Sequence, residues 1–427
     1  MKKTLCYTVN VDSASAIPSF YGGKMTMELS NTSKTTKAQK NILFTAMSGL
    51  GLQSMSTMLL SFVLATMISD FGINGAAGGF ISTITNIGML VGGIIFGTLA
   101  DRKGRVKIFV ITVAIFSIAT GGMAFANNIY LVYLFRFLVG VGGGGEYGVV
   151  MSMVADSFSS EKRGRVNSYV TISGQVGSIV AALAAALIIP MFGWRALFIF
   201  GALPIFLAIY AHFKLEESEE WRKEVLETQV KPSIKDLFTE GRASVTIRLT
   251  IMAIAQVAGY FGLMNWLPSI LQQKIGLTVS GSSYWMIATI VGMSIGMLFF
   301  GQIMDKVGAK FAYALFLIAS AIAVFIYSFA DSGMAILLGG AAVGFFCNGM
   351  NAGYGAIVGN LYPSHIRATA NNIIFNIGRA VGGFSSVFIG FFLDNYSLTI
   401  AMLFLSILYI ISLLSVLSLK MKNNKGE

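Results

Sequence analysis

Twelve apolar stretches, each long enough to cross a lipid bilayer, constrain the fold of this chain more than any other feature. A helix needs about 20 mostly apolar residues to cross the hydrocarbon core. The stretches cover residues 41–69, 76–99, 106–126, 129–155, 166–189, 194–213, 248–273, 281–304, 309–330, 333–360, 367–393 and 397–419. Only 11% of the 427 residues are charged, against about 25% in soluble domains. The sequence therefore predicts an all-α integral membrane protein with twelve transmembrane helices, and excludes an ordinary cytosolic enzyme.

The basic residues lie almost entirely on one side of the predicted spans. Of the 30 Lys and Arg residues, only Arg195 and Lys274 fall on the opposite side, and only Arg136 and Arg379 lie deep inside spans, away from the span ends. Because cytoplasmic loops carry the excess of Lys and Arg, we expect both termini and the 214–247 loop to be cytoplasmic. We expect the protein itself to lie in the plasma membrane. This asymmetry explains the net charge of +11 through the bilayer, with no nucleic acid as partner.

The sequence offers neither a metal site nor an enzyme active site. Cys6 and Cys347 are far apart, and the two histidines, His212 and His365, cannot form a cluster. The glycine-rich run at 140–148 lies inside an apolar span, whereas a phosphate-binding loop follows a strand. No nucleophile and base stand in a recognisable pattern. We expect no cofactor, no metal and no enzymatic activity.

The N-terminal 40 residues are polar and lack a signal-peptide pattern. They are interpreted either as a disordered cytoplasmic tail or as the result of a misassigned start, with translation beginning at Met25 or Met27. The codons for Gly22 to Lys24 could supply a ribosome-binding sequence before Met25. The expected organisation is a tail at 1–40, a six-helix bundle at 41–213, a central loop at 214–247, a second bundle at 248–420 and a tail at 421–427.

Three landmarks of the first half recur in the second half at one spacing. An offset of 204 residues relates three pairs, which are Gly97 and Gly301, Asp101 and Asp305, and Arg163 and Arg367. A shared offset indicates a parallel repeat, in which two pseudo-symmetric six-helix halves are related by an axis along the membrane normal. Transporters that work by alternating access are built in this way.

The first of these landmarks is also the strongest motif in the chain. The pattern Gly97-x-x-x-Asp101-Arg102-x-Gly104-Arg105 is similar to the signature of the major facilitator superfamily. Arg136-x-x-x-Gly140, Gly193-Trp194-Arg195 and the acidic segment 216–221 resemble the proton-coupled metabolite symporters that include sialic acid and aromatic acid transporters. The resemblance covers about residues 41–420. It implies the twelve-helix facilitator fold, with spans 1, 4, 7 and 10 around a central cavity.

The charged residues at the cytoplasmic helix ends are candidates for a gate. An ion pair that forms only when this side is closed would bias a two-state equilibrium. Plain anchoring of the loops by basic residues is the alternative. The gating candidates are Asp101, Arg102, Arg105, Arg163, Arg165, Asp305 and Arg367.

Two charged residues in span 4 are candidates for proton coupling. Glu146 is the only acidic residue deep within a span, and burying an unpaired carboxylate is costly. The resemblance supports the same role for Arg136. Ten residues separate the two, which is too far for a direct pair. Alternatively, Glu146 is structural and bonded to a neighbouring helix or to Arg163 and Arg165, and Arg136 extends to the outer interface.

Arg379 is the main candidate for binding substrate. It lies near the middle of span 11, on one helical face with Asn372, Asn376, Gly383 and Ser386. A planar guanidinium matches a carboxylate through two hydrogen bonds. The alternative is a buried arginine that helix carbonyls or Glu146 satisfy.

Other polar residues of the spans could orient the same solute. Subtracting 204 from Arg379 gives Gln175. Hydrogen bonds that only hold helices together are an equally good explanation for each of these residues. The remaining substrate-binding candidates are Gln175, Gln53, Gln256, Tyr260, Asn376, Asn348 and Asn351.

Span 1 departs from the family pattern. Related symporters carry acidic residues where this chain has Gln53 and Ser56. Coupling then rests on Glu146, uses another ion, or is absent. We expect a monomeric secondary transporter that takes up a small organic anion, a sialate-like or aromatic carboxylate, with protons. The alternatives are an uncoupled facilitator, a proton-driven exporter of lipophilic compounds and a non-transporting sensor.

Overall fold

A computed structural model of the chain describes residues 18–21, 24–27, 36–158, 160–217, 234–239, 241–363 and 366–419. Strands β1 (Pro18–Tyr21) and β2 (Lys24–Met27) pair in antiparallel fashion. Most of the predicted N-terminal tail, most of the central loop and the C-terminal tail lie outside the described residues.

Helices and the short connections between them make up the remainder of the described chain. The first half contains α1 (Lys37–Phe71), α2 (Gly75–Lys103), α3 (Arg105–Gly122), the 3₁₀ helix η1 (Met123–Phe125), α4 (Ile129–Ser157), α5 (Ser160–Phe200) and α6 (Pro204–Lys214). The second half contains η2 (Ile234–Leu237), α8 (Ala243–Ile275), α9 (Val279–Val307), α10 (Ala309–Tyr327), α11 (Gly333–Gly349), η3 (Met350–Gly353), α12 (Tyr354–Leu361), α13 (Arg367–Gly382), α14 (Ser385–Asn395) and α15 (Leu398–Ser418).

These helices make the twelve predicted crossings. Ten helical segments of the described chain are long and apolar enough to span a membrane. One of them, Val166–Lys214, makes two passes because the chain turns at Gly193, whose φ of 76° is not helical. The tenth crossing is divided among α11, η3 and α12, so no single helix accounts for it. The prediction of an all-α, twelve-span fold is confirmed.

The two halves repeat each other in structure as they do in sequence. Helix α9 begins and ends 204 residues after α2. The positive-φ turn at Gly104 before α3 recurs at Gly308 before α10. Helix packing repeats as well, because Gly92 lies directly against the Val141 carbonyl and Gly296 against the Phe345 carbonyl. The predicted pseudo-symmetry is thus confirmed at the level of individual backbone contacts.

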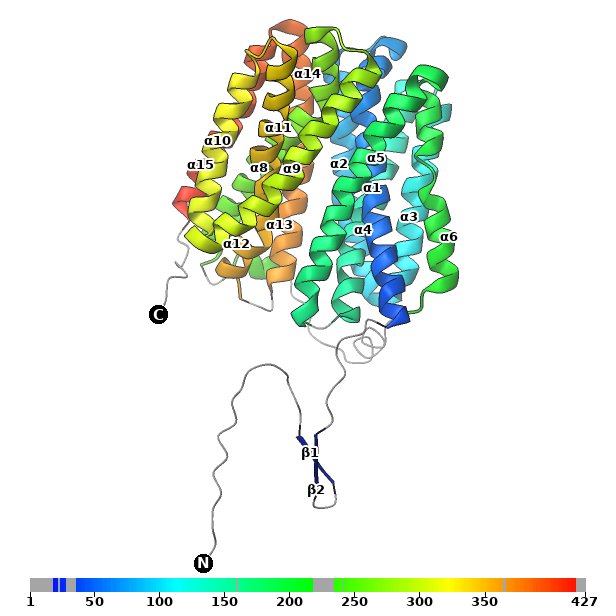
Figure 1. The fold of residues 1–427 in the computed structure, drawn as a ribbon, viewed down its shortest axis with the longest axis vertical. Helices are drawn as coiled ribbons and strands as arrows, with labels where there is room; N and C mark the ends of the chain where they lie inside the picture. Colours follow the sequence, from blue (N-terminus) through cyan, green and yellow to red (C-terminus); the bar gives the residue numbers. More distant parts are fainter. Residues whose placement is uncertain are drawn as a thin grey trace, which may run out of the picture.

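The halves stand side by side, as Figure 1 shows. The start of α1 and the end of α15 lie at the same end of the bundle, which we call the terminal end, and the turns after α1 and α8 lie at the opposite, distal end. Between the halves, α2 contacts α13 and α14, and α5 contacts α9. Gly79 meets the Ser386 backbone, which brings α2 and α14 close together at the distal end.

Candidate functional site

The polar stripe predicted on span 11 lies between the halves. Arg379 and Asn376 are half-buried on α13, and the Arg379 guanidinium lies 5.5 Å from the centre of the Phe375 ring. Within the described part of the chain, neither a helix carbonyl nor Glu146 forms a hydrogen bond or ion pair with this guanidinium. A cation held at this depth is costly unless something pairs with it, so the site suits an anionic ligand.

Two tyrosines, one from each half, are close enough to interact electrostatically with Arg379. They are Tyr147 on α4 and Tyr260 on α8. Tyr147 is 39% exposed, whereas its neighbour Glu146 is completely buried. The two consecutive residues therefore point to different faces of α4. Tyr147 faces the other half, and Glu146 faces the interior of its own half.

Several of the predicted substrate-binding amides bond to one another instead of standing free. The Gln256 amide donates to Asn351 (3.0 Å), and the Asn351 amide donates to Asn348. On α13, Asn376 donates to Asn372 (2.5 Å). In α1, Gln53 donates to Thr57 (3.3 Å). Gln175 is half-buried on α5.

Glu146 is packed among apolar groups and glycine. Its carboxylate oxygens are buried, with no hydrogen-bond partner among the described residues, and a Cβ at Gly49 would lie 2.5 Å from one of them. The side chains of Arg163 and Arg165, the predicted alternative partners, lie outside the described residues.

Arg136 is buried in the same half. It is 1% exposed and lies 5.4 Å from the Phe198 ring centre, so it does not extend to the interface. No ion pair joins it to Glu146 in the described chain.

At the distal end, hydrogen bonds connect the halves. The Asp394 carboxylate of α14 accepts from the Gly75 backbone N–H at the start of α2 (2.6 Å). Thr83 donates to the Gly383 carbonyl (2.9 Å), and the Asn265 amide donates to Ser82 (2.5 Å). Ser280 of α9 donates to the Ala186 carbonyl of α5 (2.7 Å). Within the described residues, the hydrogen bonds between the halves lie in this distal part of the spans, so the distal end is closed.

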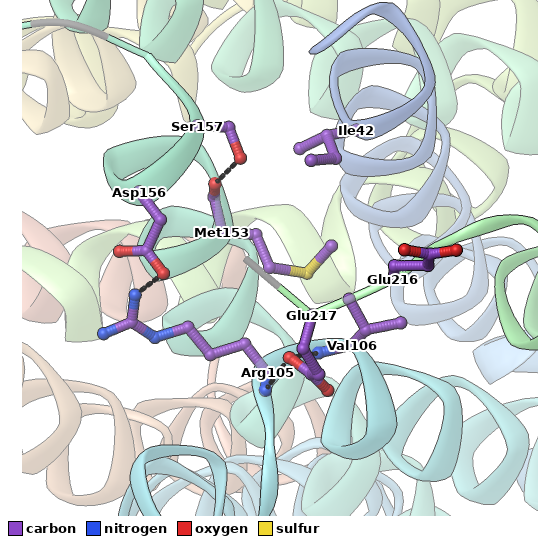
Figure 2. A pocket seen from close by; sticks show the side chains of 8 residues that line it. All are labelled: Ile42, Arg105, Val106, Met153, Asp156, Ser157, Glu216 and Glu217. Carbon is purple, nitrogen blue, oxygen red and sulfur yellow. Dashed lines mark hydrogen bonds and ion pairs between the residues drawn. The ribbon is translucent and has the colours of Figure 1, made fainter. Parts of the chain in front are cut away.

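At the terminal end of the first half, the signature motif forms a compact charged cluster, shown in Figure 2. Arg105 of α3 forms an ion pair with Asp156 of α4. Glu217, which follows α6, accepts from the backbone N–H groups of Arg105 (2.8 Å), Val106 (3.1 Å) and Lys107 (3.0 Å). A small pocket lies between these groups and the end of α4.

The other predicted gating residues are distributed around this end. Arg102 is exposed, and the Asp101 side chain lies outside the described residues. In the second half, Asp305 is exposed, and the Arg367 guanidinium donates to the Tyr362 carbonyl (2.8 Å). Tyr362 also shares a hydrogen bond with Thr246 (2.7 Å). Burial raises the pKa of the Tyr362 hydroxyl, which the hydrogen bond to Thr246 and the charge of Arg242 partly oppose.

Comparison with known proteins assigns this architecture to a family. The profile described as Major Facilitator Superfamily matches residues 46–294 and 249–426. The chain belongs to the major facilitator superfamily. This confirms the resemblance drawn from the signature motif.

Relatives of this facilitator are transporters of metabolites. A Haemophilus influenzae protein named for metabolite transport is 36% identical over 379 residues, which cover 87% of this chain and 93% of that protein. The cis,cis-muconate transport protein of Acinetobacter baylyi is 30% identical over 364 residues, covering 83% and 87%. A crystal structure of a D-xylose–proton symporter shares the fold, with a TM-score of 0.76 at 17% identity, covering 90% of this chain and 98% of that chain. The protein is therefore a multi-pass membrane transporter of metabolites.

Three residues to which the sequence assigned no role contribute to these sites, although one of them, Glu217, lies in the acidic segment 216–221. Tyr147 lies within the glycine-rich run at 140–148, yet its direction depends on how the halves face each other. Glu217 and Asp394 bind backbone N–H groups, which leave no mark in the sequence. Only the position of Asp394 near the end of a span, among few acidic residues, could have drawn attention to it.

Proposed function

We propose that this protein takes up a small organic anion, a carboxylate, by proton symport with alternating access. The observation that carries the proposal is Arg379, a cation between the halves without an acidic partner in the described chain. A carboxylate would form two hydrogen bonds with its guanidinium. The relative named for transport of cis,cis-muconate, a carboxylate, supports this class of solute.

Glu146 is the proposed proton site. A charged carboxylate in this apolar surrounding has a large desolvation cost, which protonation removes. Protonation in one conformation and release in the other would link proton movement to closure. Arg136, which is buried ten residues away on the same helix, is proposed to take part in this coupling.

The proposed direction and place of transport follow from the charge distribution. With the basic loops in the cytoplasm, the terminal end faces the cytoplasm and the closed distal end faces outward across the plasma membrane. The solute site would then be accessible from inside. Gln175 and Gln53 of the first half would help to orient the solute. The bonded residues Gln256, Asn351 and Asn348 would hold α8, which carries Tyr260, to α11 and η3. We propose that the working unit is a monomer.

An uncoupled facilitator is the second candidate, and span 1 favours it. Gln53 bonds to Thr57 in its own helix, and Ser56 donates to the Gly201 carbonyl (3.3 Å). Neither residue can exchange a proton at physiological pH.

The test is solute-driven proton movement in proteoliposomes that contain a pH-sensitive dye. A panel of small carboxylates, sialic and aromatic acids included, is added to the parent protein and to the Arg379→Ala and Glu146→Gln variants. Symport predicts proton influx with at least one acid, lost in both variants, while Glu146→Gln retains counterflow of the acid. Counterflow of an acid without proton movement in the parent protein would identify it as an uncoupled facilitator. A folded protein that responds to none of the acids would contradict the carboxylate assignment.

A further inference from the structure

Three aromatic residues lie near the Arg379 guanidinium. Phe375 lies under it at 5.5 Å, and the hydroxyls of Tyr147 and Tyr260 interact with it electrostatically. The amide that lies nearest along α13, Asn376, is bonded to Asn372. A solute held by Arg379 therefore meets aromatic rings and two hydroxyls.

The geometry of α4 and α13 directs Tyr147 and Arg379 toward each other. Gly93 of α2 lies beside both helices, since a Cβ there would lie 3.4 Å from the Asn376 amide of α13 and 3.5 Å from the Gly144 carbonyl of α4. These parts of α4 and α13 therefore lie at one level. Tyr147 comes three residues after Gly144 in α4, and Arg379 comes three residues after Asn376 in α13. Each therefore lies on the same face of its helix as the residue at that level. Helices α4 and α13 run in opposite directions between the ends of the bundle, and side chains lean toward the N-terminus of their own helix. The side chains of Tyr147 and Arg379 therefore lean back toward this level from opposite sides.

We propose that Tyr147, Tyr260 and Phe375 form an aromatic site over Arg379 that selects a flat, conjugated carboxylate, such as an aromatic acid, over a bulky or polyhydroxylated one. Tyr147 is the specificity-determining residue supplied by the first half. This inference rests on the proposed function, since it names the class of anion that the Arg379 site takes.

Ring chemistry favours a flat acid in two ways. Aromatic pairs attract each other beyond the area that they bury, in offset or edge-to-face geometry, which a saturated ring cannot match. A sialate carries many hydroxyl groups, and each one buried without a partner is costly. The Gln256 amide already donates to Asn351, and the Asn376 amide already donates to Asn372, so part of the hydrogen-bonding capacity of these amides is used within the protein.

Tyr147 also gives the solute a contact in each half. The carboxylate would bind the Arg379 guanidinium of the second half while the Tyr147 hydroxyl donates to it from the first half. A solute that holds both residues draws α4 and α13 together at the level of Gly93. The residue before Tyr147 is Glu146, so the same turn of α4 carries the proposed solute contact and the proposed proton site.

The experiment is direct binding of four acids to the purified full-length protein by isothermal titration calorimetry. The acids are benzoate, nicotinate, cyclohexanecarboxylate and N-acetylneuraminate. The variants are Tyr147→Leu, Tyr147→Phe and Arg379→Ala. Tyr130→Leu is the matched control, because Tyr130 is on the same helix and 79% exposed.

We expect a flat acid to bind the parent about two- to tenfold more tightly than cyclohexanecarboxylate, as an aromatic contact of the usual strength predicts. Tyr147→Leu should remove most of this preference, and Tyr130→Leu should leave it intact. Tyr147→Phe should keep the preference, since the ring remains, but should bind both acids more weakly, since the hydroxyl is lost.

Two results would overturn the inference while leaving the proposed function in place. The first is that the parent binds flat and saturated acids with equal affinity, and both need Arg379. The second is that the preference for the flat acid survives in Tyr147→Leu. If Arg379→Ala leaves binding unchanged, or if no carboxylate binds in the panel, the proposed anion site itself fails and this inference falls with it.

Discussion

Glu217 holds the first turn of α3 although 112 residues separate it from Arg105, whose backbone N–H it binds. The first N–H groups of a helix have no partner within the helix, and a carboxylate there also complements the helix dipole. Gly104, the residue before α3, has a φ of 110° and lies directly against Glu217. A side chain at position 104 would therefore displace the carboxylate as well as strain the turn.

Replacing Glu217 by glutamine should lower the stability of the first half. The amide keeps an acceptor oxygen but loses the charge, and we expect a cost of about 1 kcal/mol, typical of a lost cap. Thermal unfolding of the purified protein in detergent would measure it. Glu216→Gln, which removes a neighbouring charge, is the control, and equal effects of the two variants would contradict the capping role.

Arg379→Lys should weaken carboxylate binding by about tenfold or more, although the positive charge remains. Lysine presents a point charge and cannot form the paired, planar hydrogen bonds of a guanidinium, and a tenfold change corresponds to about 1.4 kcal/mol. Counterflow of an acid that the parent transports would give the change in apparent affinity. An unchanged affinity would mean that the site needs only a cation.

At the scale of elements, glycines set the distance between paired helices in both halves. Gly92 of α2 lies against the Val141 carbonyl of α4, and the equivalent Gly296 of α9 lies against the Phe345 carbonyl of α11. Both contacts are to backbone, which cannot move aside as a flexible side chain can. Small residues at such positions allow close helix packing in membranes.

Gly92→Ala and Gly296→Ala should therefore destabilise the two halves to similar extents, by about 1–3 kcal/mol each, as overpacking does elsewhere. The matched controls are Gly97→Ala and Gly301→Ala, five residues further along the same helices, where an added Cβ meets nothing within 4 Å. Unfolding temperatures in detergent would compare the four variants. A loss confined to one half would show that the repeat does not extend to packing energetics.

The sequence predicted elements better than it predicted contacts, for physical reasons. Span number and the repeat follow from apolar composition and from a constant offset, which are properties of the chain itself. Arg379 could be found because a cation in an apolar span is rare. The breaks at η3 and after Gly382, and the direction of Tyr147, depend on how neighbouring helices pack. No local pattern encodes that packing.

For the whole molecule, the distribution of contacts between the halves defines which end is closed. Asp394 bonds to the start of α2, and Asn265 bonds to Ser82, so closure of the distal end depends on a few polar bonds between the halves. In contrast, Asp70 at the same end accepts from the Trp194 indole (2.6 Å) within the first half. An alternating-access cycle must break the first set of bonds and can leave the second intact.

Asp394→Ala should open the distal end more often. A cysteine placed at Ser82, which is 5% exposed, would report this in a protein whose Cys6 and Cys347 are replaced by serine. We expect a maleimide dye to label Ser82→Cys slowly in detergent, and several-fold faster once Asp394→Ala is added, because the carboxylate bond to Gly75 is lost. Asp70→Ala is the control, since its partners lie in one half. Equal acceleration by both variants would indicate general loosening and would contradict a closing role for Asp394.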